Sequence, residues 1–70
     1  MDQATAEKIL LAYRELDEET EQEYGYKITG YLGPDADGHT FNVICDDGAA
    51  DYEPVPVGVY PPDTVLFLPR

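Results

Sequence analysis

The sequence predicts an α+β fold in which one N-terminal amphipathic helix packs on a small antiparallel sheet of three to four strands. Apolar residues between Thr5 and Glu23 recur at helical spacing, the period changes to two from Tyr26, and turn residues separate the later apolar runs. With 70 residues the chain has room for a single domain, residues 1–70, with a thin hydrophobic core.

The helix is expected at about residues 3–23. Asp2 or Thr5 can act as its N-cap, and Tyr24-Gly25 is typical of a C-terminal stop. One face is expected to pack on the sheet, because its residues recur at the i, i+3, i+4, i+7 spacing. These residues are Ala6, Ile9, Leu10, Tyr13, Leu16 and Thr20.

Acidic residues crowd the last turns of this predicted helix. The helix macrodipole is negative at that end, and like charges three or four residues apart repel each other. A sequence selected for stability alone would place lysines there. We therefore interpret the acids as a surface that is kept for a partner.

Four strands are expected after the helix, at about residues 26–32, 40–45, 50–55 and 64–68. In the second strand Phe41, Val43 and Cys45 share one face, with Asn42 and Ile44 on the other.

Turns and prolines set the expected order of these strands. The segments 33–38 and 46–48 are rich in Gly and Asp, which predicts two hairpin turns. Prolines between Pro54 and Pro62 predict an edge strand or an extended connector, because proline cannot donate a ladder hydrogen bond. The segment 64–68 is apolar on both sides, which predicts an interior strand.

The charge of the chain selects the kind of partner. Fifteen acidic and four basic residues give a formal net charge of −11. Direct binding to DNA, RNA or an anionic membrane is disfavoured, because phosphate contacts need Lys and Arg, and a basic partner is favoured instead. A lone Cys45, together with the lack of a signal-peptide pattern or a membrane-spanning run, predicts a cytoplasmic protein.

Two arrangements of side chains could carry chemistry, and neither is complete. If Gly38 were the invariant glycine of a calcium loop, Gly33 and Ile44 would stand at ligand positions, so we expect a solvated turn and no metal or cofactor. His39 and Cys45 would lie about 20 Å apart on an extended strand, too far for a base and a nucleophile. We therefore expect no enzymatic activity. The acids and histidine considered as metal ligands are Asp35, Asp37, His39, Asp46 and Asp47.

The candidate partner-binding residues are two groups of acids with two tyrosines beside them. Carboxylates three or four apart on a helix are about 5–6 Å from each other, comparable with successive phosphates of a nucleic acid. Exposed tyrosine is common in protein-binding surfaces, although these tyrosines can also simply flank the sheet with their hydroxyls in water. The candidates are Glu15, Asp17, Glu18, Glu19, Glu21 and Glu23; Asp46, Asp47, Asp51 and Glu53; and Tyr24 and Tyr52.

In size, charge and α+β make-up the chain resembles the small acidic phage proteins that mimic nucleic acid, including many anti-CRISPR proteins. The resemblance is one of composition over the whole chain, with no residue motif, so it transfers no functional residue. It implies an inhibitor in the host cytoplasm that binds a basic, nucleic-acid-binding protein or defence complex and blocks its DNA or RNA site. The alternatives are a halophilic acidic domain with a housekeeping role, and an antitoxin-like or immunity-like partner of a basic protein. The sequence leaves open whether the protein is a monomer or a homodimer.

Overall fold

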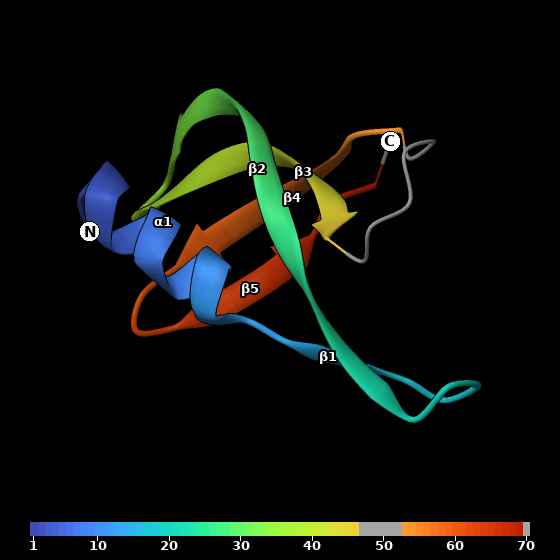
Figure 1. Ribbon diagram of the computed structural model, residues 1–70. Helices are drawn as coiled ribbons and strands as arrows, with labels where there is room; N and C mark the ends of the chain where they lie inside the picture. Colours follow the sequence, from blue (N-terminus) through green and yellow to red (C-terminus); the bar gives the residue numbers. More distant parts are fainter. Residues whose placement is uncertain (47–52, 70) are drawn as a thin grey trace.

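The computed structural model describes residues 1–46 and 53–69, which form one helix and five antiparallel strands (Figure 1). The strands lie side by side in the order of the sequence, β1-β2-β3-β4-β5. The predicted α+β class, with an N-terminal helix on an antiparallel sheet, is confirmed, and the sheet has one strand more than the upper expectation. The elements are α1 (Gln3–Ala12), β1 (Glu15–Asp17), β2 (Gln22–Asp35), β3 (Gly38–Asp46), β4 (Val55–Tyr60) and β5 (Thr64–Phe67).

Helix α1 is much shorter than the predicted helix. It begins with Asp2 as N-cap, whose Oδ1 accepts a hydrogen bond of 2.7 Å from the backbone N–H of Thr5, and this bond lowers the pKa of Asp2. It ends at Ala12, because Tyr13 has extended backbone angles. The prediction of a helix to residue 23 is therefore wrong.

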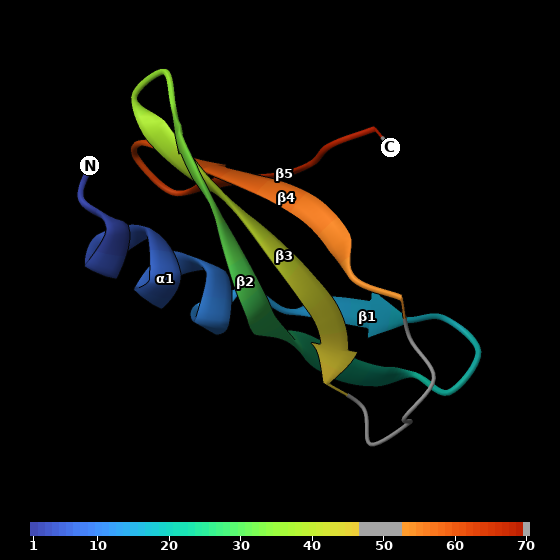
Figure 2. The same cartoon turned by 90° about the horizontal axis from the view of Figure 1, so that it is seen from above.

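The segment predicted as the second half of the helix is a β-hairpin. Glu15 of β1 pairs with Tyr24 of β2, and Asp17 pairs with Gln22. The loop between the strands, residues 18–21, ends with Glu21 in the left-handed region at φ 57°. Acids that would oppose the dipole at a helix C-terminus do not meet that penalty in a hairpin. This hairpin projects away from the rest of the molecule (Figures 1 and 2).

The core lies between α1 and one face of the sheet. Ala6 and Leu10 of the helix are fully buried, in one cluster with buried side chains of β3 and β4. The predicted alternation in β3 is confirmed at Phe41 and Val43, which are also fully buried. Val57 and Val59 of β4 complete the fully buried core of the described residues.

The sheet is strongly curved. Register shifts in β2, at Thr29 and Leu32, interrupt its pairing with β3 and bend the strand. As a result, Phe67 at the end of β5 reaches Tyr26 of β2, with ring centroids 5.2 Å apart. The edge strand β5 therefore approaches β2 around the core.

The positions of the last two strands are the reverse of the prediction. The proline-rich segment supplies β4, which lies inside the sheet between β3 and β5, whereas Thr64–Phe67 forms the edge strand β5. The carbonyl of Pro56 accepts from the N–H of Leu68, and the nitrogen of the same residue points in the same direction. The missing N–H of Pro56 therefore faces Leu68, just after β5, and removes no hydrogen bond to β3. Of the strand predicted at 50–55, residues 50–52 lie outside the described part, and Val55 begins β4.

Candidate functional site

The most acidic part of the described chain is the hairpin of residues 15–24, which we call the acidic hairpin. Six of its ten residues are acidic and none is basic. It consists of β1, the connecting loop and the first residues of β2, and it extends beyond the body of the molecule (Figure 2). Its acids are Glu15, Asp17, Glu18, Glu19, Glu21 and Glu23.

The base of the acidic hairpin is held by tyrosines that converge on one carboxylate. The hydroxyl of Tyr13 donates to Oε1 of Glu15, and the hydroxyl of Tyr24 donates to Oε2, both at 2.8 Å. The Tyr26 ring lies 5.8 Å from the Tyr24 ring and 6.1 Å from the Tyr13 ring. Glu15 thus connects the end of α1 to β2, and its carboxylate has a structural role.

The protonation states of this network follow from its hydrogen bonds. Burial alone would raise the pKa of Glu15, but the hydrogen bonds from Tyr13, Tyr24 and Tyr26 outweigh burial and lower it. Burial raises the pKa of Tyr26, and hydrogen bonds with Tyr24 and Glu15 raise it further. A carboxylate whose pKa is lowered is a weak general base at neutral pH, so this network is suited to holding the hairpin in place.

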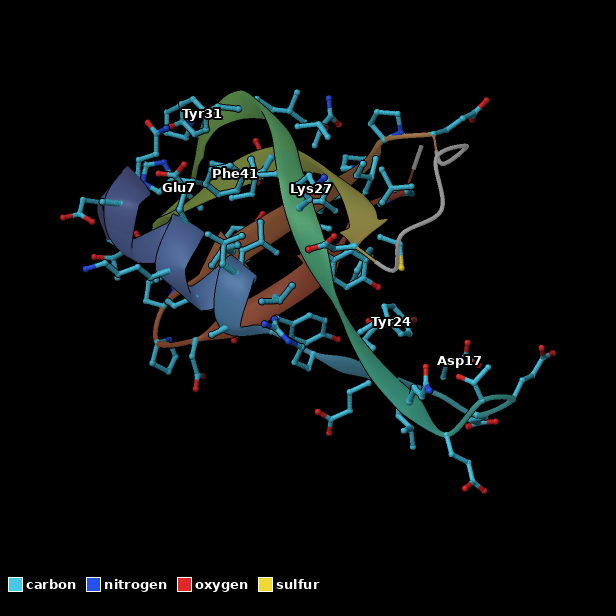
Figure 3. The ribbon with its side chains drawn as sticks, viewed as in Figure 1. Glu7, Asp17, Tyr24, Lys27, Tyr31 and Phe41 are labelled. Carbon is cyan, nitrogen blue, oxygen red and sulfur yellow. The ribbon has the colours of Figure 1, made fainter. Side chains whose placement is uncertain are left out.

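The tip of the acidic hairpin is closed by Asp17. Its Oδ1 accepts from the backbone N–H of Glu19 at 2.9 Å, and its carbonyl accepts from the N–H of Glu21 at 2.8 Å. Figure 3 shows Asp17 on the projecting part of the hairpin, beyond Tyr24. Asp17, like Glu15, is therefore occupied in maintaining the fold. The four remaining acids of the hairpin are exposed: Glu18, Glu19, Glu21 and Glu23.

The structure brings the start of the second acidic group to the acidic hairpin. Asp46, at the end of β3, pairs with Gly25 of β2. Together with Asp17 and Glu23 it lines a hollow of about 260 Å³. Three predicted site residues, Asp47, Asp51 and Tyr52, lie outside the described residues, and Glu53 is exposed ahead of β4.

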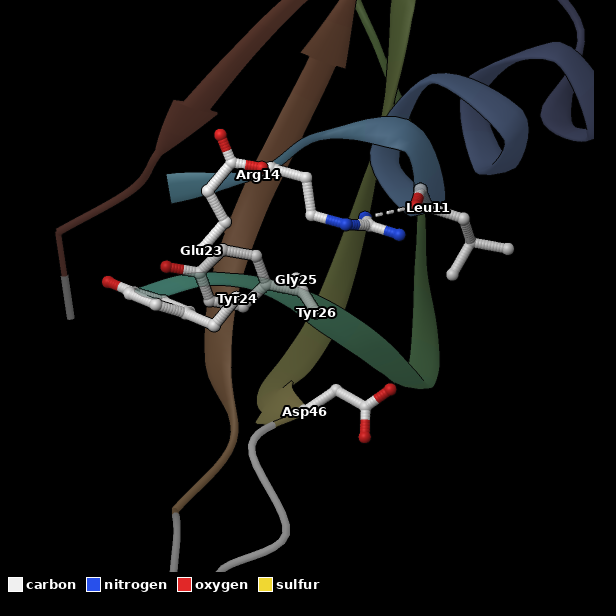
Figure 4. Close-up of a pocket in the computed structure, with 7 residues that line it drawn as sticks. All are labelled: Leu11, Arg14, Glu23, Tyr24, Gly25, Tyr26 and Asp46. Carbon is white, nitrogen blue, oxygen red and sulfur yellow. Dashed lines mark hydrogen bonds between the residues drawn. The ribbon is translucent and has the colours of Figure 1, made fainter. Parts of the chain in front are cut away.

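Arg14, which the sequence did not indicate as a site residue, lies beside these acids. Arg14 donates to the carbonyls of Leu11 and Tyr13, at 2.6 and 2.9 Å, and so binds the C-terminal end of α1 (Figure 4). Its guanidinium crosses Gly25, where an added Cβ would lie 2.6 Å from Nη1. With Glu23 and Asp46 it lines a hollow of about 470 Å³. Gly25 was the one sequence feature that could have indicated this position of Arg14, but it faces Arg14 only if the segment forms a hairpin.

Two of the residues considered for metal binding and catalysis, Asp35 and His39, are engaged in other contacts. Asp35 accepts a hydrogen bond of 2.7 Å from the hydroxyl of Tyr60. His39 contacts the carbonyl of Met1 through Nε2 at 2.8 Å and the hydroxyl of Tyr31 through Nδ1 at 2.7 Å. Since a carbonyl only accepts, Nε2 carries the proton, and the histidine holds the N-terminus on the β2–β3 hairpin.

Residues 1–46 and 53–69 contain no group of three or more His, Cys, Asp and Glu side chains placed to hold a metal ion. The same residues include no helix with the length and apolar character needed to cross a membrane. Comparison of the chain with models of protein families, with curated proteins and with solved structures found no match.

Proposed function

We propose that the protein is a non-enzymatic inhibitor whose acidic hairpin enters the basic groove of a nucleic-acid-binding protein and blocks its DNA or RNA site. The observation that carries the proposal is the hairpin itself, a projecting arm with four exposed carboxylates, a fixed base and no basic residue. An anti-defence role, as the anti-CRISPR-like composition implies, is one setting in which such an inhibitor would act.

The geometry of mimicry differs from the helical one that the sequence suggested. Three of the four exposed carboxylates, those of Glu18, Glu19 and Glu21, lie in the loop between β1 and β2, and Glu23 follows in β2, so their charge is concentrated at the end of one narrow arm. A groove shaped for a phosphate backbone can accept such an arm.

The fixed base of the hairpin favours tight binding. A partner does not have to order the arm, because Glu15 and Asp17 already hold its two ends by hydrogen bonds. Preorganisation of this kind improves affinity by lowering the entropy lost on association. The net charge of −11 adds electrostatic steering toward a basic surface and accelerates encounter at low salt.

The experiment is competition on immobilised duplex DNA loaded with basic proteins from a lysate of the source cells. Wild-type protein is expected to displace a specific DNA-binding protein or complex, which mass spectrometry then identifies. The triple variant E18Q/E19Q/E21Q removes three exposed carboxylates without touching Glu15 or Asp17, and it is expected to lose most of this activity. Displacement should also weaken as salt rises.

A matched control removes the same charge elsewhere. The variant E7Q/D37N/D63N also neutralises three acids, all outside the acidic hairpin, and is expected to displace the same protein almost as well as wild type. If both triple variants lost the same displacement activity, net charge would explain the effect, and the proposed role of the acidic hairpin would be contradicted. Displacement unchanged in E18Q/E19Q/E21Q would contradict the proposal directly.

A further inference from the structure

The outer edge of β5 carries backbone groups whose direction can be assigned. Among residues 1–46 and 53–69, β5 pairs only with β4, and the N–H of Leu68 donates to the carbonyl of Pro56 at 3.0 Å. Because backbone groups alternate in direction along a strand, Leu66 also faces β4, whereas Val65 and Phe67 turn their N–H and C=O groups outward. In the described part of the chain no backbone hydrogen bond reaches these four outward groups.

This edge differs from the opposite edge of the sheet in charge. β1 carries two acids, which discourage pairing with another strand. β5 has the sequence TVLF, with no charge and no proline inside it. Leu66 is 52% exposed on one face of β5, and Phe67 is 39% exposed on the other. An uncharged, apolar edge with free backbone groups is a template for an added strand.

An apolar groove lies along the same edge. It has a volume of about 250 Å³ and runs between the end of α1 and the start of β5. Its lining is mostly apolar, with one acid: Ile9, Ala12, Tyr13, Asp63 and Val65. A strand added to the edge would direct alternate side chains into this groove.

We propose that β5 pairs with β5 of a second copy of this chain, forming an antiparallel homodimer with a continuous ten-stranded sheet. With Leu66 opposite the partner's Leu66, Val65 lies opposite the partner's Phe67 and Phe67 opposite the partner's Val65. This register joins all outward N–H and C=O groups of both strands in four hydrogen bonds. The two leucines then form a non-hydrogen-bonded pair, in which side chains approach most closely.

The distribution of charge and the symmetry of paired strands favour a second copy as the occupant. Copies of a chain with a net charge of −11 repel each other through their acids, and a basic partner is attracted first to the acidic hairpin. Residues 54–69 contain a single acid, Asp63, so two copies that approach through β5 meet the least repulsion. An antiparallel pair of identical strands also satisfies the two-fold symmetry of a closed dimer. The inference does not depend on the proposed function.

The test is analytical ultracentrifugation of the full chain from micromolar to millimolar concentration in 0.15 M NaCl. Wild-type protein is expected to shift reversibly from 7.8 kDa to twice that mass as concentration rises. L66K places two ammonium groups directly opposite each other and should weaken dimerisation by about tenfold or more. L32K is the matched control, because Leu32 is equally exposed, at 52%, but lies in β2 and should still dimerise.

Amide hydrogen exchange tests the register independently. Protection of the Val65 and Phe67 amides is expected to rise with protein concentration, whereas the Leu66 amide, already paired with β4, should change little. A monomer at every concentration, with fast exchange at Val65 and Phe67, would overturn the proposal. A dimer that L66K leaves intact would overturn it as well, because the contact would then lie on another face.

Discussion

Glu15 shows how a single carboxylate can decide the conformation of a segment. In a helix it would stand among repelling acids, but in the hairpin it accepts hydrogen bonds from Tyr13 and Tyr24. Charge-assisted bonds of this kind are stronger than bonds between neutral groups. The sequence places Tyr13 two residues before Glu15 and Tyr24 nine residues after it, a spacing that is informative only once the hairpin is known. By contrast, the N-cap Asp2 and the core residues Phe41 and Val43 depend on local pattern and were predictable.

The Glu15 network makes stability depend on pH at both ends of the scale. The folded pKa of Glu15 is lowered, so its contribution is complete above the unfolded value of about 4.5 and is lost as pH falls through the folded pKa. The folded pKa values of Tyr13, Tyr24 and Tyr26 are raised, so their contribution is complete below about 10 and is lost as pH rises further. E15Q is expected to be less stable at pH 7 and to lose less stability in acid than wild type. Urea unfolding from pH 2 to 11, with tyrosine absorbance at alkaline pH, measures both effects.

The control for this prediction is E19Q, which neutralises an exposed carboxylate in the loop of the same hairpin. Its acid-side loss of stability should follow that of wild type. If E15Q and wild type lost equal stability between pH 5 and pH 2, the network would not be a source of the acid dependence.

At the scale of elements, the helix and the hairpin compete for the same residues. The spacing of Leu10, Tyr13 and Leu16 fits a helical face, so periodicity alone extends the helix too far. The repulsion among acids at its end was interpreted as a sacrifice for function, but it was evidence against the helix. Arg14 donates to the carbonyls of Leu11 and Tyr13 at the end of α1, and hydrophobic periodicity does not predict this interaction.

The same limit applies to the last two strands. Whether a proline can lie inside a sheet depends on which neighbour its nitrogen faces, and that is fixed only by register. The nitrogen of Pro56 faces the end of β5 and needs no acceptor there, so β4 can be interior. The existence and approximate position of the β2–β3 hairpin were predictable, because its period of two and its turn residues are local signals.

The hairpin structure predicts different roles for its acids. D17A is expected to destabilise the fold by about 1 kcal/mol, because the N–H of Glu19 loses its acceptor. D17N keeps an acceptor oxygen and should retain most of the stability. The variant E18Q/E19Q/E21Q changes only exposed loop side chains and should stay within about 0.5 kcal/mol of wild type. Urea unfolding monitored by far-UV circular dichroism measures all three; a gain well above 0.5 kcal/mol in the triple variant would support a helix end instead.

At the scale of the whole molecule, the charge is concentrated away from the core and away from β5. The acidic hairpin projects from a molecule that, with the hairpin included, measures 35 × 22 × 20 Å, so its exposed carboxylates lie away from the packed side chains of α1 and β4. Six of the fifteen acids therefore lie on an arm that hydrogen bonds hold in place. This distribution favours a folded state that does not need high salt, unlike a halophilic domain whose acids require counter-ions.

The final prediction is a modest dependence of stability on salt. The protein is expected to remain folded at 10 mM NaCl, where the Debye length is about 30 Å, and to gain a few degrees in melting temperature by 0.5 M as repulsion is screened. In E18Q/E19Q/E21Q the net charge is −11 + 3 = −8, so the gain should be smaller than in wild type. Melting is followed by circular dichroism at low micromolar concentration, where dimerisation through β5 contributes least. Unfolding at 10 mM that molar salt reverses would identify a halophilic domain, and the acids of the hairpin would then serve the solubility of the chain rather than a partner.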